Sequence, residues 1–67
     1  MIALQNGRVL PCASIQKITF WEKEQKLEIE TDSGFVIVRG KSGLLDVVSL
    51  TAKCNAGDIH CRISRHS

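Results

Sequence analysis

Residues 26–38 read KLEIETDSGFVIV and carry the clearest structural pattern in the chain. Apolar and charged side chains alternate from Lys26 to Thr31, which is typical of a β-strand with one buried face. The Asp-Ser-Gly sequence at 32–34 predicts a tight turn, because glycine adopts the positive φ that such turns need. The stretch therefore predicts two antiparallel strands joined by a short turn.

The second of these strands, Phe35-Val36-Ile37-Val38, has no polar face. A continuous apolar strand is usually covered on both sides. The chain has 67 residues, and a domain of about 60 residues buries only about 60% of the surface that its unfolded chain exposes. We therefore expect these four residues to form an interface between copies of the chain.

The residues before this hairpin predict three further strands. Asn6-Gly7 is a strong signal for a two-residue hairpin turn, and it would join strands at residues 1–5 and 8–13. Residues 15–21 form a third predicted strand. Its apolar side chains change phase near residues 16–17, which predicts a β-bulge there.

The residues after the hairpin are less clearly patterned. Gly40–Gly43 predicts a flexible loop. Residues 44–51 fit a strand by their β-branched composition, with a helix as the alternative, and residues 58–64 predict a closing strand. We expect one all-β domain over residues 1–67, a small antiparallel meander of six to seven short strands that forms a sandwich or open barrel and is oligomeric.

Composition limits the class of protein. Hydrophobic residues make up 43% and charged residues 24% of the chain, which excludes a disordered tail. Its longest apolar run of four residues is far short of the roughly 20 that a bilayer crossing needs. Three cysteines and no recognisable export signal indicate reduced thiols. We expect a cytoplasmic protein without a membrane span.

The charge distribution suggests one basic surface. The net charge is +2, and most of the excess lies in the second half of the chain. The candidate residues for binding a partner or an anion are Trp21, Arg39, Lys41, Arg62 and Arg65. The alternative is an ordinary solvated surface of mixed charge.

Four side chains are weak candidates for a metal site: Cys54, His60, Cys61 and His66. The chain has no Cys-x-x-Cys motif, and neighbouring residues of a strand point to opposite faces. We therefore expect no metal and no cofactor. No serine lies in a nucleophile-elbow motif, and we expect a protein that is not an enzyme.

Motifs from Ile2 to Ser64 carry a family resemblance. They are Asn6-x-Arg8, Ile15-x-x-Ile18, Phe20-Trp21-Glu22 and Glu30-Thr31-Asp32-Ser33-Gly34-Phe35-Val36-Ile37-Val38-Arg39-Gly40. In this order the chain resembles the YabP/YqfC family of small sporulation proteins from endospore-forming bacteria. The resemblance implies an all-β domain that acts in spore assembly without known catalysis.

A second resemblance is to Sm-like proteins, through Leu4-x-Asn6-Gly7-Arg8 and Val36-Ile37-Val38-Arg39-Gly40. It implies ring-forming RNA binding. Pro11 and Cys12 stand where that pattern has a bend-forming glycine, and its Asp-x-x-Asn element is missing. Nucleic acid is therefore not the partner we expect.

These observations predict a non-catalytic β-domain that acts by self-association and by binding a partner, which we expect to be another protein. One alternative is a phage-type or accessory inhibitor that binds a host protein or sequesters an anionic nucleotide at a subunit interface. The second alternative is the Sm-like RNA-binding oligomer.

Overall fold

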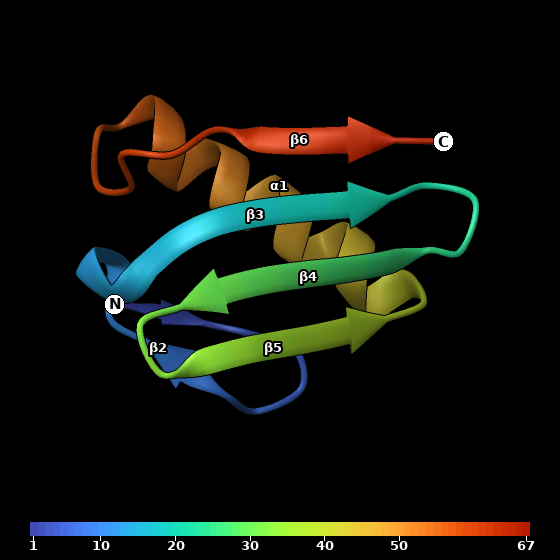
Figure 1. The fold of residues 1–67 in the computed structure, drawn as a ribbon, viewed down its shortest axis with the longest axis horizontal. Coiled ribbons are helices and arrows are strands. Elements are labelled where there is room, and N and C mark those ends of the chain that lie inside the picture. Colours follow the sequence, from blue (N-terminus) through green and yellow to red (C-terminus); the bar gives the residue numbers. More distant parts are fainter.

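The computed structural model describes all 67 residues as a four-stranded sheet with one face covered by a helix and a two-stranded hairpin. In Figure 1 the helix and the hairpin lie behind the four strands. The elements in chain order are β1 (Ile2–Ala3), β2 (Val9–Leu10), a short 3₁₀ helix η1 (Cys12–Ser14), β3 (Ile15–Trp21), β4 (Lys26–Thr31), β5 (Gly34–Arg39), α1 (Lys41–Asn55) and β6 (Ile63–His66).

The strand order in the sheet is β5-β4-β3-β6. β3, β4 and β5 form an antiparallel meander, whereas β6 runs parallel to β3. Parallel neighbours need a crossover connection, and α1 supplies it by passing across one face of the sheet. This topology makes β5 and β6 the two edge strands.

The central strands follow the alternation predicted from the sequence. β4 buries Leu27 and Ile29 completely, and β3 buries Ile18 and Phe20 on the same side of the sheet. The predicted bulge is also present, as a shift in register between Ile15 and Lys17. The sheet contributes most of the core, whose buried apolar residues are Ile2, Leu4, Leu10, Ile15, Ile18, Phe20, Leu27, Ile29, Val36, Val38, Val47, Leu50 and Ile59.

The expectation of an all-β meander was wrong in its C-terminal half. The protein is mostly strand, but residues 41–55 form α1, so neither the strand at 44–51 nor the loop at 40–43 is present. The buried residues of α1 are Gly43, Asp46, Val47 and Leu50. Their spacing of three or four residues is that of one helix face, and this face packs on the sheet.

The expected closing strand is displaced. β6 begins at Ile63 rather than at residue 58, and residues 56–62 form the connection from α1. Ile59 is buried in this connection, while Cys61 and Ile63 are half-buried against the core. The 15-residue α1 is neither long nor apolar enough to cross a membrane.

The N-terminal hairpin is present with a turn one residue longer than predicted. The Leu4 N–H donates to the Arg8 carbonyl at 2.7 Å, and the Gly7 N–H donates to the Leu4 carbonyl at 3.0 Å. Gly7 has φ +91°, which is the left-handed position that closes a three-residue hairpin loop. The hairpin buries Ile2, Leu4 and Leu10 in the core.

β5 is covered on one face only. Val36 and Val38 are buried beneath α1, whereas Phe35 is 66% exposed and Ile37 is 45% exposed on the opposite face. The helix approaches β5 closely, because a Cβ on Gly43 would lie 3.0 Å from the Val38 carbonyl oxygen. The predicted four-residue interface is therefore divided, with two residues inside the subunit and two outside.

Candidate interaction surface

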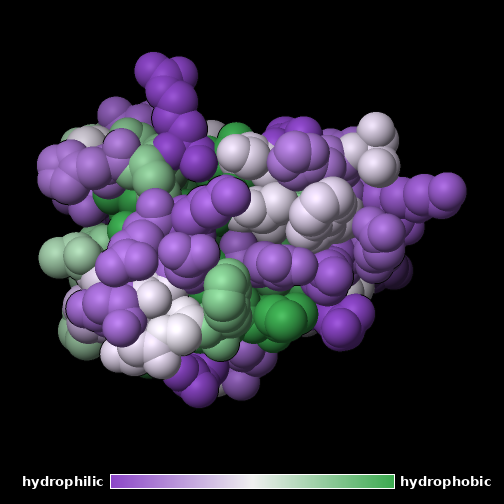
Figure 2. Space-filling view, in the orientation of Figure 1, coloured by the Kyte–Doolittle hydropathy of each residue, from purple (hydrophilic) through white to green (hydrophobic).

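The sheet face opposite α1 is open to solvent and is called the outer face. Every second side chain of each strand points to it. Its residues are Lys17, Thr19 and Trp21 on β3, Lys26, Glu28 and Glu30 on β4, Phe35, Ile37 and Arg39 on β5, and Ser64 and His66 on β6. Figure 2 shows a green apolar patch over β5, bordered by hydrophilic surface.

The apolar patch consists of Phe35 and Ile37, the exposed large hydrophobic residues of the sheet. They lie on an edge strand, which makes their side chains accessible from the face and from the side. Large exposed apolar side chains rimmed by polar residues are typical of protein contact sites.

Trp21 lies at the other side of the outer face, next to the sheet edge formed by β6. Its ring stacks on His66 with the centroids 4.8 Å apart, and the Lys26 ammonium lies 6.0 Å from the indole centroid. The indole N–H is buried and has no hydrogen-bond partner. Trp21 is therefore half-buried and held in place, as a residue that anchors a contact needs to be.

A shallow hollow of about 420 Å³ lies between the Trp21–His66 pair and Phe35. Its lining is mostly polar, with charged side chains of both signs. The lining residues are Lys17, Thr19, Trp21, Glu28, Glu30, Phe35 and His66. This shape suits a broad contact with another surface better than the enclosure of a small molecule.

The free edge of β5 has unpaired backbone groups. β5 borders β4 alone, and in an antiparallel ladder every second residue of an edge strand turns its N–H and C=O away from the neighbour. The Gly40 N–H donates to the Gln25 carbonyl at 2.8 Å, which extends the β4–β5 ladder. The even-numbered residues 34–40 therefore face β4, and Phe35, Ile37 and Arg39 face outward.

Charge is distributed unevenly along β4 and β5 on the outer face. Lys26 and Arg39 are opposite each other at one end, and Glu30 is opposite Phe35 at the other end. Glu28 lies between them and forms an ion pair with Lys26 at 3.2 Å. Along β4 and β5 the outer face is thus basic at one end and acidic at the other, and Lys17 of β3 lies opposite Glu30.

The basic residues that the sequence predicted as one binding site do not lie close together. Arg39 and Lys41 lie at the end of β5, whereas Arg62 precedes the start of β6 on the opposite edge. Because β5 and β6 run in the same direction, these two groups are also at opposite ends of the sheet. No single anion contact can use all of them.

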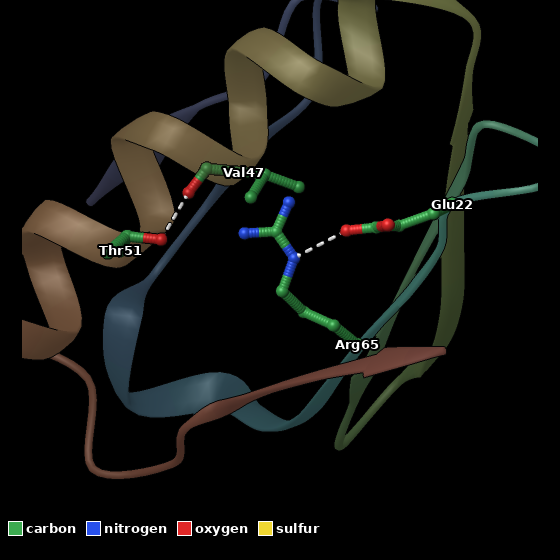
Figure 3. Close-up of polar contacts among 4 residues, drawn as sticks. All are labelled: Glu22, Val47, Thr51 and Arg65. Atoms are coloured by element: carbon green, nitrogen blue, oxygen red, sulfur yellow. Dashed lines mark hydrogen bonds and ion pairs between the residues drawn. The ribbon is translucent and has the colours of Figure 1, made fainter. Parts of the chain in front are cut away.

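Arg65 is engaged in contacts within the chain. Its Nε lies 3.0 Å from the Glu22 Oε1, and its guanidinium carbon lies 5.7 Å from the Phe20 ring centroid. In Figure 3 its side chain extends toward α1 near Val47 and Thr51, where the Thr51 hydroxyl donates to the Val47 carbonyl at 2.7 Å. Arg65 therefore ties β6 to the β3–β4 turn and to the helix side of the sheet.

The cysteine and histidine candidates are also divided. The Cys54 thiol donates to the Cys61 carbonyl at 3.0 Å, whereas His66 lies on the outer face against Trp21. Burial raises the pKa of both the Cys54 and Cys61 thiols. Protonated thiols are poor nucleophiles and metal ligands, and no three potential ligand side chains cluster in the structure.

One exposed apolar feature was not predicted. Leu44, Leu45 and Val48 of α1 are 38%, 57% and 70% exposed, on the side of the helix away from the sheet. A helical reading of residues 44–51 would have revealed this stripe, because the three residues lie within one turn of each other. It provides a second exposed apolar surface on the molecule.

Comparison with family models, with curated proteins and with solved structures finds no match to this chain.

Proposed function

We propose that the protein is a non-catalytic interaction module that self-associates and binds a partner through β5. One observation carries this proposal: β5 is an edge strand with outward-facing backbone groups, and it also exposes Phe35 and Ile37. Natural proteins protect such edges with lysine, proline or bulges. Within Gly34–Arg39, β5 has no lysine, proline or bulge, and its one charged residue, Arg39, is the last of the strand, which supports a strand that is used for pairing.

The rest of the outer face supports binding rather than chemistry. Trp21 and His66 form a stacked pair beside a shallow hollow, and Glu28 is neutralised by Lys26 at 3.2 Å. Aromatic residues and arginine are enriched in protein interfaces, and charged residues such as Glu28 and Lys26 are typical of the polar rim. The additional partner is therefore expected to be a protein that covers this face.

The resemblance to the YabP/YqfC family implies a role in assembly, which agrees with this proposal and stays a prediction. Cytoplasmic location also stays a prediction. Sequestering of an anionic nucleotide and Sm-like RNA binding have less support, since the basic residues proposed for anion contact lie at opposite edges of the sheet.

Substitution of Ile37 tests the proposal. An Ile37→Lys chain should have a dissociation constant at least about 10-fold higher than that of the unmodified chain, because the change places a charge in the contact. Mass measured by light scattering over a dilution series gives this constant. Val48→Lys is the matched control, since it removes an exposed apolar residue from α1 instead, and it should leave the dissociation constant unchanged.

Two results would contradict the proposal. Equal dissociation constants for Ile37→Lys and the unmodified chain would show that β5 is not used. Dissociation by Val48→Lys alone would place the contact on the exposed helix stripe. Thermal unfolding followed by circular dichroism checks that each variant is folded. We expect both to fold, because Ile37 and Val48 are exposed and lie outside the core.

A further inference from the structure

We infer that the partner bound at the edge of β5 is a second copy of this chain, added antiparallel with its Ile37 directly opposite Ile37. This inference rests on the proposed function and specifies its geometry. The result is a two-fold dimer with one continuous eight-stranded sheet, in which β5 of each subunit is no longer an edge. Three features of β5 support this pairing: its outward backbone groups, the side chains beside them and the charges on the outer face.

The backbone groups select the register. Phe35, Ile37 and Arg39 turn their N–H and C=O groups outward, so these residues must pair with each other. Paired residues of this kind exchange two hydrogen bonds in an antiparallel ladder. Only the register centred on Ile37 uses all three residues, and it forms about six hydrogen bonds between the subunits. A shift by two residues in either direction moves one pair into the 32–33 turn or into α1.

The side chains fit the same register. Ile37 of one subunit lies beside Ile37 of the partner subunit, so the two exposed apolar residues cover each other. Phe35 lies beside Arg39 of the partner subunit, where a guanidinium gains a favourable contact with an aromatic face. Cross-strand neighbours are about 4.5–5.5 Å apart, which brings both pairs into contact.

The charges favour the antiparallel orientation. Glu30 is the β4 neighbour of Phe35, and therefore lies two strands away from Arg39 of the partner subunit, about 9–10 Å between backbones. The extended arginine and glutamate side chains can span this distance above the Phe35 ring. Glu30 of each subunit thus meets Arg39 of the other, whereas a parallel pairing of the two β5 strands would turn the two outer faces to opposite sides of the sheet and separate these charges.

The second edge of the sheet is less suited to pairing. β6 has only four residues, and its Arg65 is held by Glu22. Edge strands this short are poor templates for another strand, and β5 is two residues longer. Pairing of β5 with β5 uses the same surface twice and closes on itself, so a dimer is expected rather than a filament.

Complementary charge variants test the orientation. In a dimer of the Arg39→Glu chain, the new carboxylate would face Glu30 of the partner subunit. In a dimer of the Glu30→Lys chain, the new ammonium would face Arg39 of the partner subunit. Each variant alone should have a dissociation constant at least about 10-fold higher than that of the unmodified chain, since like charges replace opposite ones at both symmetric contacts. An equimolar mixture of the two variants restores opposite charges at both contacts. Its dissociation constant should lie within about 3-fold of that of the unmodified chain.

The control pair is Arg62→Glu and Glu24→Lys, which makes the same charge changes at exposed positions outside the contact. These variants should associate like the unmodified chain, alone and mixed. A dimeric unmodified chain whose two charge variants fail to associate when mixed would overturn the inferred orientation and leave the proposed function standing. An unmodified chain that is monomeric would overturn both.

Discussion

Asp46 joins two parts of the chain that lie far apart in sequence. Its carboxylate is 1% exposed and accepts the Gln5 N–H, with both oxygens 3.1 Å from the nitrogen. The contact ties the N-terminal hairpin to α1. Removing a buried partner leaves a donor unsatisfied, which costs about 1–3 kcal/mol.

We therefore expect Asp46→Ala to lower the free energy of unfolding by about 1–3 kcal/mol in urea denaturation. Asp58→Ala is the control, because Asp58 is exposed and lies 3.8 Å from Lys53 in a surface ion pair. Such pairs contribute about 0–1 kcal/mol. An Asp46→Ala chain as stable as the Asp58→Ala chain would show that the Gln5 contact adds nothing.

The same residue gives a pH dependence with a defined sign. Burial raises the pKa of Asp46 above its ordinary value, and the Gln5 hydrogen bond offsets this only in part. The folded state therefore binds the proton more tightly than the unfolded state. The stabilisation from the protonated group is fully present below the ordinary aspartate pKa of about 4, and it is lost as the pH rises through the higher pKa of the folded state.

The expected result is that the unmodified chain loses stability relative to Asp46→Asn as the pH is raised from about 3 toward neutrality. Urea denaturation of both chains at several pH values measures this difference. A gain of the unmodified chain over Asp46→Asn across that range would contradict a raised pKa.

The role of Asp46 could not be predicted from the sequence. An aspartate between apolar residues resembles a break in a pattern, and only the packing of the hairpin against α1 places the Gln5 N–H beside it. The bulge near residues 16–17 was predictable, because it depends on the phase of apolar residues within one strand.

Among the elements, α1 depends on close contact with β5. Gly43 allows this contact, since a Cβ there would lie 3.0 Å from the Val38 carbonyl oxygen and 3.6 Å from the Leu27 Cβ. A larger side chain must push the helix away from the sheet. Overpacking of this kind costs about 1–3 kcal/mol.

Gly43→Val is accordingly expected to lower the free energy of unfolding by about 1–3 kcal/mol. Ser49→Val puts the same side chain at an exposed position of α1 and should change stability by less than about 1 kcal/mol. Urea denaturation compares the two variants. Equal effects would show that the approach of α1 to β5 does not limit the size of residue 43.

The elements differ in how well the sequence predicts them. β3 and β4 were predicted to the residue and β5 to within one residue at each end. Strict alternation marks β4 as a strand with one buried face, whereas β5 was recognised as a short apolar run bounded by turn residues. α1 was mistaken for a strand because two of its four buried residues, Gly43 and Asp46, are not apolar and hide the helical spacing. The β-branched residues near its middle then favoured the wrong structure.

For the whole molecule, one helix and one hairpin cover a single face of a four-stranded sheet. The sequence predicted that the chain cannot cover both faces of residues 35–38, and Phe35 and Ile37 are indeed exposed. Which residues face inward could not be predicted, because the run Phe35–Val38 is apolar throughout. The covering of the open side by a second copy stays a prediction.

Edge pairing through one strand buries less surface than a large obligate interface does. Interfaces below about 1,200 Å² belong to weak and transient complexes, so a dissociation constant of about 1–100 μM is expected. The association should therefore depend on concentration. Substitution at Ile37 should weaken it without changing the stability of the subunit.

The most direct test is the mass of the unmodified chain in solution, measured by light scattering from about 1 μM to 1 mM under reducing conditions. The mass is expected to rise from the 7.4 kDa of one chain to twice that value over this range. A folded chain that keeps the mass of one subunit at every concentration would contradict it.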